Sequence, residues 1–313
     1  MKRRTFLQLG AAAGAALFGA APAPHAAAAT DHPEAIRVRV KDVFTRNQNR
    51  STVASTRGMV CASQPLAAQA GLDILKAGGN AIDAAVCCNA MLALTEPMSC
   101  GPGGDLFAIV WSASDQRLYG LNASGRSPYD WSLEAAREMG LDSIPGRSPL
   151  SWSVPGCVSG WDLLLSRFGN KPLAEVLAPA IDYARTGFPL TPIIAASWGF
   201  SATNHPTLGE TFLQDGARPK FGDLVTNPQL ADFYAILARD GARAFYEGEV
   251  AERIVRYSEA NGGRFSMRDF SEHAANWVDP VGSTYRGHEV WEIPPNGQGI
   301  ATLQILNVLE NFD

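Results

Sequence analysis

The sequence contains few cysteines and no apolar run of the roughly 20 residues that a membrane-spanning helix needs. There are five cysteines, and this odd number argues against a framework in which each one is paired. Cys87 and Cys88 are neighbours in an apolar segment, where a disulfide between them would be strained. We therefore expect no membrane span, and we expect the cysteines to be small buried residues (Cys61, Cys87, Cys88, Cys100 and Cys157).

Basic residues are outnumbered: 26 lysines and arginines stand against 31 aspartates and glutamates, for a net charge of −5. They form no stripe or cluster, so the usual electrostatic signature of a nucleic-acid-binding protein is missing and no nucleic-acid partner is expected. Hydrophobic residues make up 46% of the chain, which is enough for a large core at this length.

The motifs of several self-contained active sites are also absent. The sequence has no G-x-S-x-G nucleophile elbow and no G-x-x-x-x-G-K-[ST] phosphate loop, so residues 101–104 are no nucleotide cradle of that kind. The histidines beyond the N-terminal segment are isolated from one another and from cysteine clusters (His32, His205, His273 and His288). Their spacing does not fit a zinc site, and we expect no metal and no other cofactor.

The first 29 residues resemble an export signal. Arg3 and Arg4 precede an uncharged run rich in alanine and glycine, and small residues at 26–29 suit a cleavage site. The order Arg-Arg-x-Phe-Leu is typical of a twin-arginine signal, and an ordinary secretion signal that happens to hold two arginines is the alternative. Removal of 1–29 would leave 23 basic residues against 31 acidic ones. We expect a bacterial protein of the periplasm or the exterior, with residues 30–50 as a leader.

Residues 51–313 contain no internal repeat and are expected to fold as one unit with α and β elements. Proline at the first turn and paired glycines at the end predict a helix over 65–76. Asn80 and Asp83 suit a reciprocal capping box for a second helix over 81–94, which is apolar almost all round and should be buried on most sides.

Apolar residues at 106–111 and 118–122, separated by a turn, predict a hairpin. Because these strands lack a clean alternation of apolar and polar residues, we expect a sheet covered on both faces. Similar signals predict further elements downstream (helices beginning near 173, 228 and 267, a strand pair within 281–293 and a final helix over 300–311). The final helix has apolar positions that need a partner (Leu303, Leu306, Val308 and Leu309).

Three groups of residues, none specific alone, together resemble the γ-glutamyltranspeptidase family. The first is G-M-V-C-A-S-Q-P-L-A at 58–67, which leads into G-L-D-I-L-K-A-G-G-N-A-I-D-A-A at 71–85. The second is G-P-G-G-D-L-F at 101–107, followed by S-G-R-S-P at 124–128. The third is V-P-G-C-V-S-G-W at 154–161, followed by P-P-N-G-Q-G at 294–299 at the start of the last helix. The resemblance covers about residues 50–313.

The resemblance implies an α+β fold, the N-terminal-nucleophile hydrolase αββα sandwich, to which both parts of a self-cleaving precursor contribute strands. It also implies that a new N-terminal threonine of the small subunit attacks an amide carbonyl. A free α-amino group on the same residue can take the hydroxyl proton, since its pKa of about 7.7–8.0 lies near neutral pH. Backbone N–H groups then hold the oxyanion.

The sequence departs from the family in one respect. A Thr-x-His segment should follow the last helix, and the T-N-H letters at 203–205 lie far upstream and run into Pro206. We therefore expect 51–313 to be a truncated large-subunit part, so that the fold is incomplete, the nucleophile lies beyond this chain and the chain alone is inactive. The small subunit of the same precursor is the expected protein partner.

Arg126 is the one candidate site residue, because the family's arginine at this point binds the α-carboxylate of the γ-glutamyl group. A guanidinium suits that role, since it is always charged and pairs bidentately with a carboxylate. A structural arginine that caps carbonyls is the alternative. Residues 101–104 are expected to shape the site without binding ligand, and Cys100 has no basic neighbour in sequence that would make it a nucleophile.

The expected substrate is a small-molecule γ-glutamyl or related amide, as for a γ-glutamyltransferase or glutathione hydrolase. The residues at 122–128 and 294–299 look closer to family branches that include acylases and small-amide hydrolases, which is the first alternative. A non-catalytic truncated member is the second.

Overall fold

The structure is a computed structural model that describes residues 52–199 and 206–312. The expected signal and leader, and the T-N-H letters at 203–205, lie outside the described residues. The chain divides into two units, Met1–Asp42 and Val43–Asp313, and every described residue belongs to the second. None of the described helices combines the length and the apolar character that a bilayer crossing requires.

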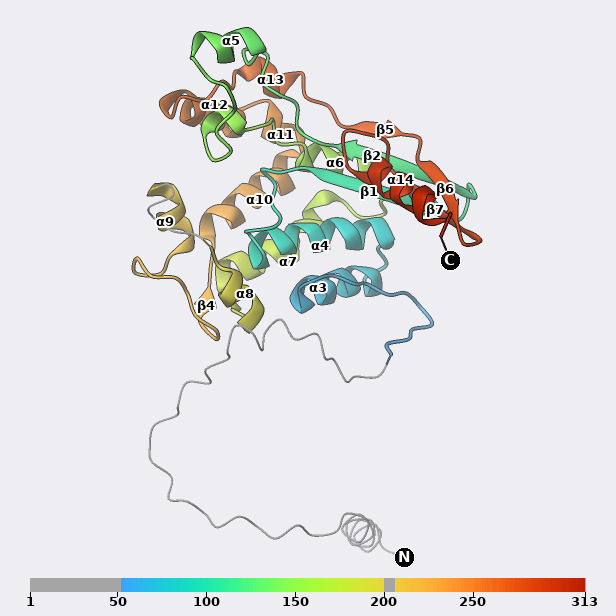
Figure 1. Ribbon diagram of the computed structural model, residues 1–313. Coiled ribbons are helices and arrows are strands. Elements are labelled where there is room, and N and C mark those ends of the chain that lie inside the picture. Colours follow the sequence, from blue (N-terminus) through green and yellow to red (C-terminus); the bar gives the residue numbers. More distant parts are fainter. Residues whose placement is uncertain (1–51, 200–205, 313) are drawn as a thin grey trace, which may run out of the picture. The chain divides into compact units, whose positions relative to one another are not determined.

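Two consecutive helices, α3 (Pro65–Lys76) and α4 (Ala81–Thr95), lie side by side (Figure 1). The predicted capping box of α4 is confirmed: Asn80 accepts from the Asp83 N–H at 3.2 Å, and the Asp83 carboxylate accepts from the Asn80 N–H at 2.7 Å. Asp83 is fully buried and also accepts from the N–H groups of Asn170 and Lys171. One carboxylate thus fixes both the start of α4 and a distant loop.

The core forms where α4 meets α6 (Cys157–Phe168) and α7 (Leu173–Thr186), with α10 (Pro228–Asp240) packed on α7. Trp161 and Tyr234 are fully buried, and their rings meet edge to face at 5.9 Å. Their polar atoms are satisfied, because the Trp161 indole donates to Asn89 and the Tyr234 hydroxyl donates to the Ala90 carbonyl. The prediction that α4 is buried on most sides is therefore confirmed.

The main sheet has three antiparallel strands in the order β1 (Leu106–Ser112), β2 (Arg117–Ala123) and β5 (Asn276–Val278). The predicted hairpin is confirmed, but the prediction that both faces are covered is wrong for the described residues. Side chains alternate across β1, and the outward ones remain exposed by 43%, 42% and 56% (Phe107, Ile109 and Trp111). No second layer among the described residues covers this face.

The remaining elements are mostly short. The predicted second hairpin, β6 (Val281–Tyr285) and β7 (His288–Glu292), is present and packs against the predicted last helix, α14 (Gly299–Leu309) (Figure 1). On α14, Leu303 is buried, whereas Val308 and Leu309 stay exposed. The other elements are α5 (Leu133–Glu138), η1 (Pro149–Ser151), β3 (Phe188–Pro189), α8 (Pro192–Ser197), α9 (Pro206–Phe212), β4 (Leu224–Val225), α11 (Arg243–Tyr246), α12 (Glu249–Ala260) and α13 (Met267–Ser271).

Candidate functional site

Arg126 lies in the loop that leaves the end of β2, and two other segments hold that loop in place. The carboxylate of Asp105, at the start of β1, accepts from the Gly125 N–H at 2.7 Å. The Arg126 carbonyl accepts from the Val154 N–H at 2.9 Å. A Cβ on Gly125 would lie 2.3 Å from the Val154 carbonyl oxygen, so the close approach requires glycine. Residues from separate motifs of the family resemblance thus contact one another around this loop.

The glycine-rich residues 101–104 connect to the same region through backbone hydrogen bonds. The Gly104 carbonyl accepts from the N–H groups of Gly156 and Cys157 at 3.0 and 2.9 Å. Both donors lie at the start of α6, where backbone N–H groups have no partner within the helix. The loop therefore joins β1 to α6 through its backbone, in keeping with the structural role expected from the sequence.

The Arg126 side chain is exposed, and none of the described carboxylates lies within ion-pair distance of it. Its charge nevertheless affects the pKa of a neighbouring histidine, His273. Burial, and then the positive charge of Arg126, lower the pKa of His273, while Asp105 acts in the opposite direction. His273 is 4% exposed, stacks on Tyr246 at 5.3 Å, and neither ring nitrogen has a described hydrogen-bond partner. His273 should therefore be neutral near pH 7 and adds no further positive charge near Arg126.

Sequence reasoning passed over His273 because the residue is isolated along the chain. Its closeness to Arg126 arises only when α13 folds against the loop that follows β2. The Asp269 carboxylate, which also caps α13, accepts from the Tyr129 N–H at 2.7 Å and makes that junction. The Tyr129 hydroxyl donates to Glu272 at 2.7 Å. No signal in the sequence alone would have joined these segments.

A group of neutral polar side chains adjoins the same loop. The Asn296 side-chain oxygen (Oδ1) accepts from the Asn122 side-chain NH₂ at 2.8 Å and from the Ser124 hydroxyl at 3.1 Å. Asn296 belongs to the P-P-N-G-Q-G sequence that precedes α14, so a third segment distant in sequence reaches the Arg126 loop. Its side chain is exposed.

Cys100 lacks the features of an activated nucleophile in the structure, as expected from the sequence. Its sulfur lies 3.2 Å from the Asn89 amide nitrogen, and burial is the main factor that raises the pKa of this thiol. The Cys157 thiol donates to the same Asn89 side chain at 3.2 Å, and burial raises its pKa as well. A thiol that resists ionisation is a poor nucleophile.

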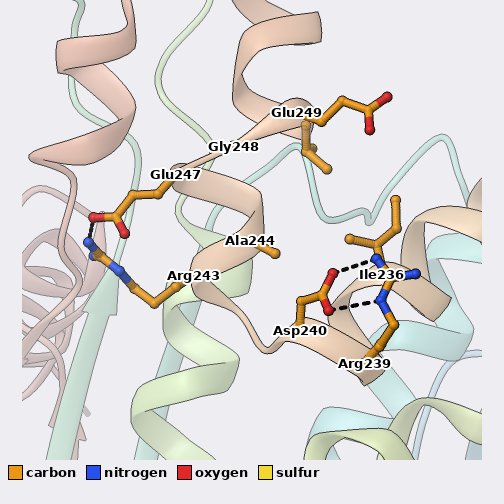
Figure 2. Close-up of a pocket in the computed structure, with 9 residues that line it drawn as sticks. Ile236, Arg239, Asp240, Arg243, Ala244, Glu247, Gly248 and Glu249 are labelled. Carbon is orange, nitrogen blue, oxygen red and sulfur yellow. Dashed lines mark hydrogen bonds and ion pairs between the residues drawn. The ribbon is translucent and has the colours of Figure 1, made fainter.

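A cavity lined by charged residues lies elsewhere, between α10 and α12, and has a volume of about 380 Å³ (Figure 2). Its two arginines are already paired: Arg239 bonds Asp240 through two contacts of 2.8 and 2.5 Å, and Arg243 pairs with Glu247. Such paired charges offer little to a ligand. Among the described residues no cluster of three or more histidines, cysteines or carboxylates could hold a metal ion.

Comparisons with known proteins agree with these features. Residues 67–313 match the family model for gamma-glutamyltranspeptidase. The glutathione hydrolase-like YwrD proenzyme of Bacillus subtilis is 39% identical over 269 residues, which are 84% of this chain and 50% of that proenzyme. The chain thus spans about half the length of this relative.

Solved structures show the same relationship. Cephalosporin acylase from Bacillus halodurans is 40% identical with a TM-score of 0.81, over 86% of this chain and 52% of that one. The γ-glutamyltranspeptidase of Helicobacter pylori is 30% identical with a TM-score of 0.78, over 84% and 77%. These neighbours are N-terminal-nucleophile hydrolases, so the predicted α+β fold class is confirmed, and the chain belongs to the γ-glutamyltranspeptidase family.

Proposed function

We propose that this chain is the carboxylate-binding part of a γ-glutamyltransferase or glutathione hydrolase precursor, and that the whole enzyme cleaves a γ-glutamyl or related amide. One observation carries the proposal. An exposed guanidinium without a partner among the described residues stands on a loop fixed by hydrogen bonds from two other segments. Recognition of a carboxylate requires an arginine whose backbone is held in place and whose guanidinium has no other partner.

In the proposed reaction, Arg126 binds the α-carboxylate of the acyl group and thereby places the scissile amide. Because His273 is neutral, the positive charge that attracts the carboxylate in this proposal is that of the Arg126 guanidinium. In this proposal the nucleophilic threonine, its α-amino base and the oxyanion donors belong to the small subunit of the precursor. No described residue of this chain is assigned to bond breaking.

The partner that we propose is the small subunit of the same precursor, and the uncovered face of β1 is where it would pack. Phe107, Ile109 and Trp111 form an apolar row on a strand whose opposite face is in the core. Exposure of such an apolar row to water is unfavourable, and the row could be buried by packing against a second sheet. A strand layer from the small subunit would complete the αββα sandwich.

An acylase or small-amide hydrolase activity is the second candidate. The neutral polar residues beside Arg126 favour it, because amide and hydroxyl groups suit an acyl group with uncharged polar atoms (Asn122, Ser124 and Asn296). The similarity to a cephalosporin acylase supports the same reading. A panel of γ-glutamyl, oxamate-type and cephalosporin-type amides would separate the two candidates.

The direct test uses the complete gene product and its Arg126→Lys variant. Lysine keeps the charge but loses the two-pronged geometry, and charge-assisted hydrogen bonds contribute about 1.5–3 kcal/mol each. We expect kcat/KM on a γ-glutamyl anilide to fall roughly tenfold to a hundredfold, while self-cleavage into two subunits continues. Residues 30–313 alone should show no turnover. If the variant fails to mature, or loses activity equally on substrates without the carboxylate, Arg126 is structural.

We also propose that residues 1–29 direct export by the twin-arginine route to the periplasm or the exterior. The motive is the Arg3-Arg4 pair ahead of Phe6 and Leu7. Replacing both arginines by lysine should keep a fused reporter in the cytoplasm. Export at the unchanged rate would contradict this proposal.

A further inference from the structure

The orientation of the polar side chains beside Arg126 follows from a single backbone group. The Ser124 N–H donates to the Asn122 side-chain oxygen at 3.0 Å, so that oxygen must face the backbone and the Asn122 NH₂ must face away. That NH₂ donates to the Asn296 oxygen, which also accepts from the Ser124 hydroxyl. The oxygen of Asn296 is therefore engaged twice, and its own NH₂ group is directed away from both donors.

This NH₂ group is unused within the described part of the chain. Asn296 is exposed, and no described residue accepts a hydrogen bond from its Nδ2. The Cα atoms of Ser124 and Arg126 can be no more than about 7.6 Å apart, since consecutive Cα atoms are separated by 3.8 Å. The Asn296 side chain is thus held by hydrogen bonds against the same loop that carries the Arg126 guanidinium.

We propose that Asn296 determines specificity by donating a hydrogen bond to an oxygen acceptor on the acyl group that Arg126 binds. This inference rests on the proposed function and deepens it. Asn122 and Ser124 are positioning residues, because they hold the Asn296 carboxamide in the one orientation that turns its donors outward. A donor fixed before the substrate arrives loses little freedom on binding, and an acyl group that lacks the acceptor leaves it unpaired.

The first experiment changes Asn296 in the complete gene product. Asn296→Asp keeps the shape but replaces the two donors by a charged acceptor, and we expect kcat/KM for an anionic acyl donor to fall more than tenfold, mainly through KM. Asn296→Ala removes the group without adding charge, and we expect a loss of about threefold to tenfold. Asn261→Asp is the matched control, because Asn261 is an exposed asparagine at the end of α12 whose NH₂ bonds the Tyr257 carbonyl. It should change kcat/KM less than twofold.

A second experiment tests the positioning role. In Asn122→Ala the group that donates to Asn296 is removed without adding charge, so the Asn296 carboxamide is no longer held in one orientation. We expect the same rise in KM as for Asn296→Ala, and no further rise when the two changes are combined. Additive losses in the double variant would show that Asn122 acts independently, and would overturn the orientation argument.

The outcomes separate this inference from the proposed function. Suppose that Arg126→Lys lowers kcat/KM for anionic acyl substrates, while both Asn296 variants keep the kcat/KM of the Asn261→Asp control. The proposed function then stands and this inference is wrong. If Asn296→Asp lowers kcat/KM for anionic and for uncharged acyl substrates by the same factor, Asn296 is structural and the inference is also wrong. If the complete gene product neither cleaves an amide nor binds L-glutamate by calorimetry, both proposals fail together.

Discussion

The region around Arg126 and the charged cavity between α10 and α12 both present arginines to solvent, yet they differ in what those arginines contact. Arg239 and Arg243 are each held by a carboxylate from the same stretch of chain (Figure 2). Arg126 has no such partner among the described residues, although its backbone is fixed on both sides. A loop with a fixed backbone and an unpaired arginine is therefore a better candidate for a ligand site than a cavity whose arginines are already paired.

Arg126→Ala should have the largest effect on activity, because it removes the charge and the N–H groups that would bind the carboxylate in a bidentate manner. We expect kcat/KM of the complete gene product on a γ-glutamyl anilide to fall by a hundredfold or more. Its thermal midpoint should change little, since the side chain has no described partner to lose. A large drop in thermal stability would show that the guanidinium is structural, and would remove the contrast with Arg239.

Asp83→Ala should affect stability instead of activity. The buried carboxylate accepts from the N–H groups of Asn80, Asn170 and Lys171, which would all lose their acceptor. We expect a loss of about 2–4 kcal/mol in the free energy of unfolding, measured by urea titration. Asp83→Asn keeps the shape and should cost less. An unchanged midpoint for Asp83→Ala would mean that water replaces the carboxylate.

His273 offers a readout of the Arg126 charge that needs no catalysis. Its pKa is lowered in the folded state, so between that value and the unfolded value of about 6.5 the unfolded chain binds more protons. Stability should therefore decrease as the pH falls below about 6.5. In Arg126→Ala the His273 pKa should rise and this dependence should become shallower, and His273→Phe should remove it. An identical pH dependence in all three proteins would contradict the coupling.

Arg239→Ala should have the smallest effect. Its contacts with Asp240 lie at the surface, where such pairs contribute about 0–1 kcal/mol. We expect unchanged kcat/KM and a free energy of unfolding within about 0.5 kcal/mol of the wild type. If this variant impairs substrate binding as strongly as Arg126→Ala, the site lies in the α10–α12 cavity.

Local signals in the sequence predicted the elements whose partners are close along the chain. The capping boxes at Asn80 and Ser266 and the hairpin of β1 and β2 are examples, since each depends on residues within a few positions. The family motifs also predicted that Arg126 is the candidate ligand residue, which stays a prediction.

Long-range arrangements could not be predicted. The contact of Asn296 with Asn122 joins residues 174 positions apart, and α6 begins where the Gly104 carbonyl meets it, neither of which leaves a local pattern. The uncovered face of β1 was mispredicted, because an apolar strand has the same composition whether its second layer comes from its own chain or from another polypeptide.

The most direct test of the central claim compares two ligands on two proteins. Calorimetric titration of the complete gene product should show that L-glutamate binds more tightly than its α-carboxamide, and that Arg126→Lys removes most of this difference while leaving the weaker binding of the carboxamide unchanged. Equal affinity of the wild type for the two ligands, or a preference that survives Arg126→Lys, would contradict the assignment of Arg126 as the carboxylate-binding residue.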